Sequence, residues 1–100
     1  MLIAAMGLTP DRLPPLHLAA CQGRLARASA LIASGRVGVN ALDAEGRTPL
    51  FYAHRVKMAR CLLLLGAEPA LLDADGRSAE LVLGEKKKLA AANAIRRSTR

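Results

Sequence analysis

Residue types that commonly carry chemistry are scarce in this chain of 100 residues. It contains two histidines, His17 and His54, and two cysteines, Cys21 and Cys61. A catalytic nucleophile needs a positioned base beside it, and no Ser-His-Asp or Cys-His arrangement is recognisable here. The spacing of these four residues matches no structural zinc site, and no glycine-rich phosphate loop follows a strand. We therefore expect no catalysis, no bound metal and no cofactor.

Acidic side chains can bind cations, but two aspartates of this chain occur in a pattern that is typical of turns. Asp43 begins the segment Asp-Ala-Glu-Gly-Arg-Thr, and thirty residues later Asp73 begins the segment Asp-Ala-Asp-Gly-Arg-Ser. An aspartate side chain can close a turn, and Gly46 and Gly76 stand where a tight turn needs a positive φ. We interpret both aspartates as turn residues.

Two further segments repeat in the same order, which indicates a repeat protein. Pro15–Ala19 is similar to Pro49–Ala53, and Leu31–Gly35 is similar to Leu62–Gly66. Three separate segments thus recur along one chain, which is a much stronger signal than any one short motif.

Each repeat unit predicts a pair of short helices. In the first unit they cover residues 15–21 and 24–34, and apolar residues line one face at three- and four-residue spacing. In the second unit Thr48 is a candidate N-cap, Pro49 takes the first helical position and Gly66 ends the second helix. Neither helix of a pair can bury its apolar face alone, so the units must stack on one another.

The composition of the chain favours helices. Apolar residues make up 52% of it but aromatic residues only 2%, so alanine and leucine supply most of the packing surface. Such side chains suit closely packed helices better than sheets. No apolar run approaches the length of a membrane span, and we expect no membrane contact. The net charge of +7 favours an acidic partner, a class that includes acidic proteins, nucleic acids and anionic surfaces.

Taken together, these motifs resemble the ankyrin repeat family. The resemblance extends over about residues 9–83 and rests on Asp43-x-x-Gly46-Arg47-Thr48-Pro49-Leu50, on Pro15-Leu16-His17-Leu18-Ala19-Ala20 with Gly23, and on Gly66-Ala67. It implies an all-α, ankyrin-type helix-turn-helix solenoid with finger loops. It also implies that His17 is structural and hydrogen-bonds within and between adjacent turns.

The repeats divide the chain into parts of one domain. These are an N-terminal cap at 1–12, a first repeat at 13–42, a short second repeat at 43–72, and a degenerate third repeat with a basic cap helix at 73–100. The chain departs from the family at Glu80, where leucine is the usual residue. We expect Leu89, Ala92 and Ile95 to form the inward face of the last helix.

The resemblance further implies a binding site for a protein partner. In this family partners dock on the turn tips and on the concave face made by the first helices. The matching positions are Cys21, Gln22, Ala44, Glu45, Arg47, Tyr52, Arg55, Ala74, Asp75 and Arg77. Arg47 and Arg77 recur at thirty residues and precede the first helices, so we expect them to be dispensable for the core. A ladder of two arginines is suited to pairing with the carboxylates of a partner.

Other surface features leave alternatives open. Lys86–Lys88 and Arg96–Arg97 form a basic cluster that suits a solvated helix face, a nuclear-import signal or a nucleic-acid contact. Leu64 and Leu65 are expected to be less buried than the leucines before them, either as an apolar contact patch or packed on the last helix. His54 lies in a predicted turn and is expected to be exposed.

The leading hypothesis is a non-catalytic module that binds an acidic protein. The alternatives are a nucleic-acid-associated protein that uses the C-terminal Lys/Arg segment, and an inhibitor that blocks a partner enzyme sterically. With no secretory signal and no disulfide framework, the two cysteines are expected to be reduced and the protein to be cytoplasmic.

The first prediction concerns assembly. If Met1–Leu8 and the last helix cover the two ends of the stack, the free protein is a monomer, because no apolar face is left to pair. Light scattering over a range of concentrations should return the monomer mass of 10.6 kDa. A dimer mass that does not change with concentration would contradict this prediction and indicate that two uncapped ends pair.

Overall fold

The computed structural model describes residues 13–98, which are helical apart from loops and an isolated bridge between Leu72 and Ser78. The described helices are α2 (Pro15–Gln22), α3 (Leu25–Ala33), the 3-10 helix η2 (Pro49–Tyr52), α4 (Val56–Leu64), α5 (Ala79–Glu85) and α6 (Leu89–Ser98). The N-terminal cap predicted at 1–12 lies outside the described residues. No helix within 13–98 has the length and apolar character needed to cross a membrane.

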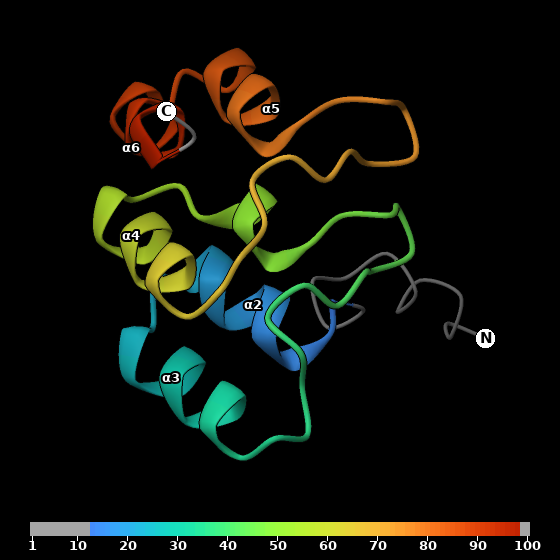
Figure 1. Ribbon diagram of the computed structural model, residues 1–100, viewed down its shortest axis with the longest axis vertical. Helices are drawn as coiled ribbons and strands as arrows, with labels where there is room; N and C mark the ends of the chain where they lie inside the picture. The colour runs from blue at the N-terminus through green and yellow to red at the C-terminus, as the bar shows by residue number, and fades with distance from the viewer. Residues whose placement is uncertain (1–12, 99–100) are drawn as a thin grey trace, which may run out of the picture.

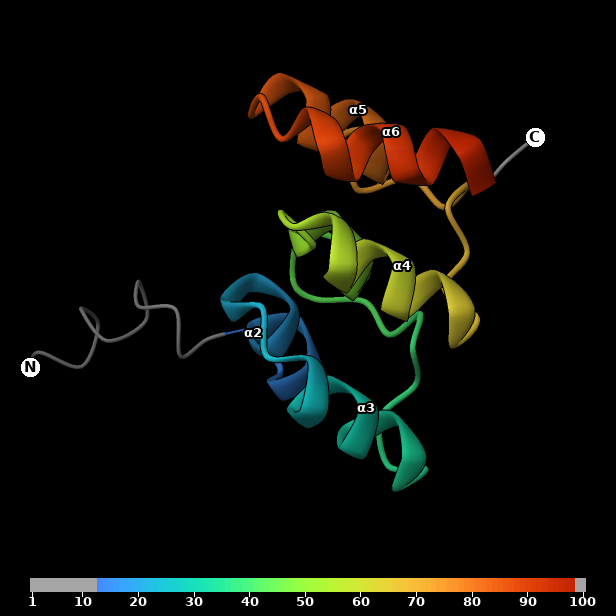
Figure 2. The ribbon, with the colours of Figure 1, turned by 90° about the vertical axis from the view of Figure 1, so that its left-hand side faces the viewer.

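The described helices form consecutive pairs that stack along the long axis of the molecule, as Figure 1 and Figure 2 show. Helix α2 packs on α3 and α5 packs on α6, while η2 and α4 form the pair between them. The first helices contact one another through η2, and the second helices contact one another through α4. The second helices α3, α4 and α6 therefore share one side of the stack. This arrangement confirms the predicted all-α helix-turn-helix fold.

Two finger loops project from the opposite side of the stack (Figure 1). They precede η2 and α5, and their tips are the repeated segments that begin at Asp43 and Asp73. Gly46 and Gly76 adopt φ values of 75° and 76°, so the predicted positive-φ turns are confirmed.

Thr48 precedes η2 as predicted, but its side chain does not cap the helix. Its hydroxyl is buried and has no hydrogen-bond partner within residues 13–98. The short second repeat forms a 3-10 turn in which the Phe51 N–H already donates to the Thr48 carbonyl at 3.1 Å, so that N–H is not available to the hydroxyl. In the third pair, by contrast, Ser78 Oγ accepts the N–H of Leu81 and caps α5.

The core is one continuous apolar cluster that runs through all the described pairs. Leu16, Leu50 and Leu83 enter it from the first helices, and Leu62 and Ile95 enter it from the second helices. Each of these five side chains is less than 2% exposed. Buried alanines fill the positions between them and let the helices approach closely, which keeps the interior dense.

The third pair differs from the sequence prediction at one core position. The chain reverses after α5 at Lys87, which has a φ of 62°, and α6 then packs against both α4 and α5. Ala92 and Ile95 face inward as predicted, but Leu89 is 60% exposed. Leu89 begins α6 and lies beside Leu81 at the open end of the stack, where no further pair covers it among the described residues.

His54 also differs from its prediction, since it is half-buried instead of exposed. Its Nε2 atom is inaccessible to water and has no hydrogen-bond partner among the described residues. Burial lowers the pKa of His54, and the charges of Lys86 and Lys88 lower it further. The turn that carries His54 thus lies close to the α5–α6 connection, which the local sequence does not reveal. Cys21 and Cys61 are free thiols, as expected.

The two finger glycines provide a matched test of the fold. Gly46→Ala and Gly76→Ala both place a side chain at positive φ, which costs roughly 1 kcal/mol. A Cβ at Gly46 would also lie 3.0 Å from the backbone nitrogen of Ala74, whereas a Cβ at Gly76 meets nothing within 4 Å. We expect thermal unfolding to show a clearly larger loss of stability for Gly46→Ala. Equal melting temperatures for the two variants would contradict the close contact between the fingers.

Candidate functional site

Each finger loop is closed by an aspartate side chain. Asp43 Oδ1 accepts the backbone N–H groups of Glu45 and Arg47, each at 2.9 Å. Asp73 Oδ1 accepts the equivalent pair of N–H groups in the next finger, also at 2.9 Å. The prediction that both aspartates close turns is confirmed, and the finger tips have a defined shape.

The fingers are also tied to one another and to the first repeat. Arg47 Nε donates to Asp73 Oδ2 at 3.1 Å, and the Ala74 N–H donates to the Glu45 carbonyl at 3.0 Å. The Arg47 carbonyl in turn accepts a hydrogen bond from His17 Nε2 at 2.7 Å. His17 is fully buried, and its predicted structural role is confirmed.

Two carboxylates in the fingers, those of Asp43 and Asp73, have a pKa lowered by hydrogen bonds. The backbone N–H of Arg77 lowers the pKa of Asp73, and hydrogen bonds from Arg47 and Asp75 lower it further against the opposing effect of burial. Burial raises the pKa of Asp43, but hydrogen bonds from the Tyr52 hydroxyl and from backbone N–H groups outweigh it, so the net shift is downward. Both carboxylates are therefore ionised at neutral pH and occupied by donors of the same chain.

The residues predicted to contact a partner are placed in two different environments. Most are exposed on the fingers or at the ends of helices, namely Cys21, Gln22, Ala44, Glu45, Arg55, Ala74 and Asp75. Tyr52 is only 8% exposed and its hydroxyl donates to Asp43, so it presents almost no surface to a partner. Burial and the hydrogen bond to Asp43 both raise the pKa of Tyr52.

The predicted arginine ladder exists, but carboxylates of the same chain already occupy it. The Arg47 side chain is only 12% exposed and pairs with Asp73, which is itself 1% exposed. Arg77 lies 3.6 Å from the same carboxylate and 3.1 Å from Glu85. The expectation that Arg47 is dispensable for the core does not fit this arrangement, because its removal would leave the buried carboxylate of Asp73 with only the longer ion pair to Arg77.

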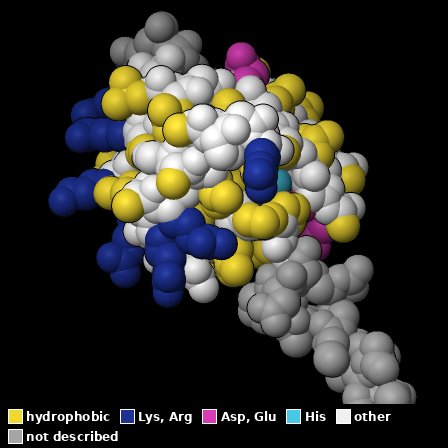
Figure 3. Space-filling view, turned by 90° about the horizontal axis from the view of Figure 1, so that it is seen from below, with side chains coloured by type: hydrophobic (Ala, Val, Ile, Leu, Met, Phe, Trp, Pro, Cys, Tyr) yellow, Lys and Arg dark blue, Asp and Glu magenta, His cyan; other side chains and the backbone are white. Residues whose placement is uncertain are grey.

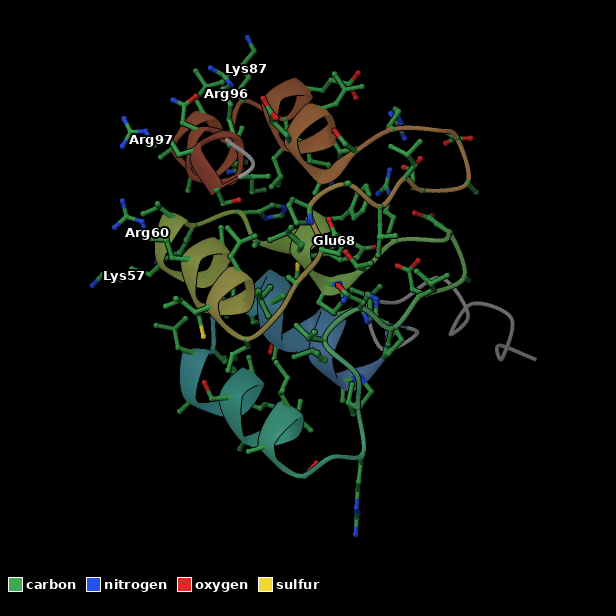
Figure 4. All side chains as sticks on the ribbon, in the orientation of Figure 1. Lys57, Arg60, Glu68, Lys87, Arg96 and Arg97 are labelled. Atoms are coloured by element: carbon green, nitrogen blue, oxygen red, sulfur yellow. The ribbon has the colours of Figure 1, made fainter. Side chains whose placement is uncertain are left out.

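The second helices, on the opposite side of the stack, carry positive charge. Helices α3, α4 and α6 contain no Asp or Glu. Lys57 and Arg60 on α4 and Arg97 on α6 point outward on this side (Figure 4). Figure 3 shows Lys and Arg side chains gathered along one side of the molecule. Lys57, Arg60 and Arg97 form no ion pair with a residue that the structure describes.

Exposed leucines accompany these cations. Leu64 ends α4 and is 87% exposed, and Leu65 is 40% exposed, so the prediction that both are poorly buried is confirmed. Two hollows flank Leu64. One lies against α3 beside Leu25, and the other lies against α6 beside Ala94.

We call the surface made by these residues the basic apolar face; it comprises Leu25, Lys57, Arg60, Leu64, Leu65 and Arg97. Of its cations, the sequence pattern drew attention to Arg97 as part of the C-terminal basic cluster, but Lys57 and Arg60 were not predicted to belong to a site. Their signal is the spacing of Lys57, Arg60 and Leu64 at positions i, i+3 and i+7, which aligns them on one stripe of a helix. Within the described residues, no cluster of His, Cys, Asp and Glu is suited to hold a metal ion.

The shared carboxylate of Asp73 provides a test of the finger geometry. In Asp73→Asn the amide can still accept the turn N–H groups, but it loses the charge that pairs with Arg47. Because the folded-state pKa of Asp73 is lowered, its stabilising effect is complete above the ordinary aspartate pKa of about 3.9 and is lost as the pH falls through the lowered value. We expect Asp73→Asn to melt several degrees below the wild type at neutral pH, with the difference shrinking in acid.

Asp75→Asn is the matched control for this variant. The Asp75 side chain is 76% exposed, so its loss should change the melting temperature little at any pH. The same melting curves for wild type and Asp73→Asn at neutral pH would contradict a structural role for the ion pair.

Comparison with known proteins agrees with this geometry. The family model described as "Ankyrin repeats (3 copies)" matches residues 2–73 of the chain. No curated protein matches the chain. Ankyrin repeats are generally protein–protein interaction modules and are typically not catalytic. With stacked helical pairs, finger loops closed by Asp43 and Asp73, and a family match over most of its length, the chain belongs to the ankyrin repeat family.

Proposed function

We propose that this chain is a non-catalytic module that binds a protein with an acidic surface. The observation that carries the proposal is the separation of charge across the stack. The second helices contain no acidic residue, and Lys57, Arg60 and Arg97 form no ion pair with any described residue. Unpaired cations on a rigid helical surface attract carboxylates without first breaking an existing pair.

An acidic protein suits this side better than a nucleic acid does. Leu64 and Leu65 lie among the cations, and a phosphate backbone would leave such apolar side chains without a partner. Phe51 and Tyr52 are buried, so neither is available to stack on a base. Nucleic-acid binding through the C-terminal Lys/Arg segment 86–100 is one of the outcomes that the experiment below distinguishes, and steric inhibition of a partner enzyme stays a prediction from the sequence.

The finger tips are a less favourable place for an acidic partner. Their most exposed charged side chains are Glu45 and Asp75, which are 67% and 76% exposed, while the arginines beside them are paired within the chain. The partner contacts predicted there stay a prediction, and reversal of these two charges tests them separately.

The proposal extends to the state of the free protein. Two copies that met through the basic apolar face would bring like charges together, which supports a monomer. The free thiols of Cys21 and Cys61 are compatible with the proposed cytoplasmic location.

The test uses the chain as bait in a nuclease-treated native lysate, followed by mass spectrometry and calorimetry on the captured protein. We expect Lys57→Glu/Arg60→Glu to lose at least about tenfold in affinity, because two favourable charge contacts become repulsive. The control Arg36→Glu/Lys87→Glu changes the net charge equally at exposed sites outside the basic apolar face and should lose much less. Glu45→Lys/Asp75→Lys should not weaken binding.

Three results would contradict the proposal. Equal losses of affinity in Lys57→Glu/Arg60→Glu and in Arg36→Glu/Lys87→Glu would indicate that the partner is attracted by net charge alone. Loss of binding in Glu45→Lys/Asp75→Lys with full affinity in Lys57→Glu/Arg60→Glu would favour the finger tips. Capture of nucleic acid instead of protein in lysate that has not been treated with nuclease, with an affinity that falls steeply with salt, would favour the nucleic-acid hypothesis.

A further inference from the structure

We propose that the basic apolar face is a docking groove for a short acidic amphipathic segment of the partner, with bulky apolar side chains entering the two hollows that flank Leu64. This inference rests on the proposed function and deepens it, because it names the surface and the kind of segment that the surface recognises.

The hollows give the groove its shape. The first has a volume of about 390 Å³ and lies between α3 and α4, where Leu25, Cys61 and Leu65 contribute to its walls. The second has a volume of about 460 Å³ and lies between α4 and α6, where Leu63 and Ala94 contribute. Leu64 and Arg60 line both hollows and form the ridge between them.

The apolar surface of the ridge is large for a side chain in water. Leu64 is 87% exposed at the end of α4, although the helix buries Met58 and Leu62 on its other face. Covering an exposed leucine on binding is favourable because it removes apolar area from water. Leu25 and Leu65, which are 37% and 40% exposed, extend the same apolar surface across the first hollow.

The charges around the hollows select the occupant. Lys57 and Arg60 stand at the first hollow, and Arg60 and Arg97 stand at the second. All three point away from the core on the same side (Figure 4). A segment with carboxylates on either side of its apolar anchors would place negative charge beside each of these cations, and repulsion excludes basic segments.

A second copy of this chain does not fit the groove through its own basic apolar face. The same face of another copy would bring its lysine and arginines against those of the first, with no acidic residue on α3, α4 or α6 to balance them. The expected occupant of the groove is therefore an acidic segment of a different protein.

The probe for this inference is a phage-displayed library of random peptides, selected on the folded full-length chain. We expect the enriched peptides to combine Asp or Glu with at least two bulky apolar residues. Synthetic forms of these peptides then report the dissociation constant for each variant by fluorescence anisotropy.

Two matched pairs of variants make the measurement specific. Leu64→Ser should weaken binding about tenfold, whereas Leu42→Ser, which removes another leucine that is 62% exposed but lies outside the groove, should leave it unchanged. Arg60→Glu should weaken binding at least as much, whereas Arg36→Glu should have little effect. Leu64, Leu42, Arg60 and Arg36 are all exposed, so circular dichroism should show that each variant folds.

The outcomes separate this inference from the proposed function. Acidic peptides whose affinity is unchanged by Leu64→Ser would overturn the docking groove and leave the proposed acidic partner in place. Peptides without acidic residues would overturn both. If no peptide is enriched, the groove is rejected, and the proposed function is then decided by whether the captured protein loses affinity for Lys57→Glu/Arg60→Glu.

Discussion

The carboxylate of Asp73 joins two consecutive finger loops, and the alignment of the repeats depends on it. One of its oxygens accepts two backbone N–H groups of its own finger, and the other lies 3.1 Å from Arg47 Nε in the preceding finger. Arg47 also offers its carbonyl to the buried His17 in the first repeat. Because the Asp73 side chain is almost inaccessible to water, its charge requires these partners within the fold. The series of hydrogen bonds that runs from His17 through Arg47 to Asp73 therefore connects all three helical pairs on the finger side.

This requirement explains how charge is distributed over the molecule. The fingers and the first helix of the third pair use acidic residues to close turns and to neutralise Arg47 and Arg77. The second helices contain no acidic residue, so Lys57, Arg60 and Arg97 on their side of the stack remain without an ion pair among the described residues. A strongly basic composition thus coexists with finger tips on which acidic side chains are the most exposed charges, and the surface available to carboxylates lies on the helices instead.

The sequence predicts the local parts of this arrangement well because they depend on short-range hydrogen bonds. The repeated Asp-x-x-Gly-Arg segments were sufficient to predict turns closed by Asp43 and Asp73 and positive φ values at Gly46 and Gly76. The same reasoning failed for Thr48, where a 3-10 turn takes up the N–H that a side-chain cap would need.

Helical periodicity, glycine positions and internal repeats were enough to predict the all-α stack and the exposure of Leu64, because both follow from local spacing and from the need to bury apolar faces. The structural role of His17 was implied by the resemblance to the ankyrin family. Only the tertiary structure decided which charges are free. The ion pair between Arg47 and Asp73 joins residues that are 26 positions apart, and the groove beside Leu64 forms where three separate helices meet. Such contacts depend on how far neighbouring repeats are rotated and shifted relative to one another. Side-chain packing along the whole stack determines this rotation and shift, so they cannot be predicted from any single segment.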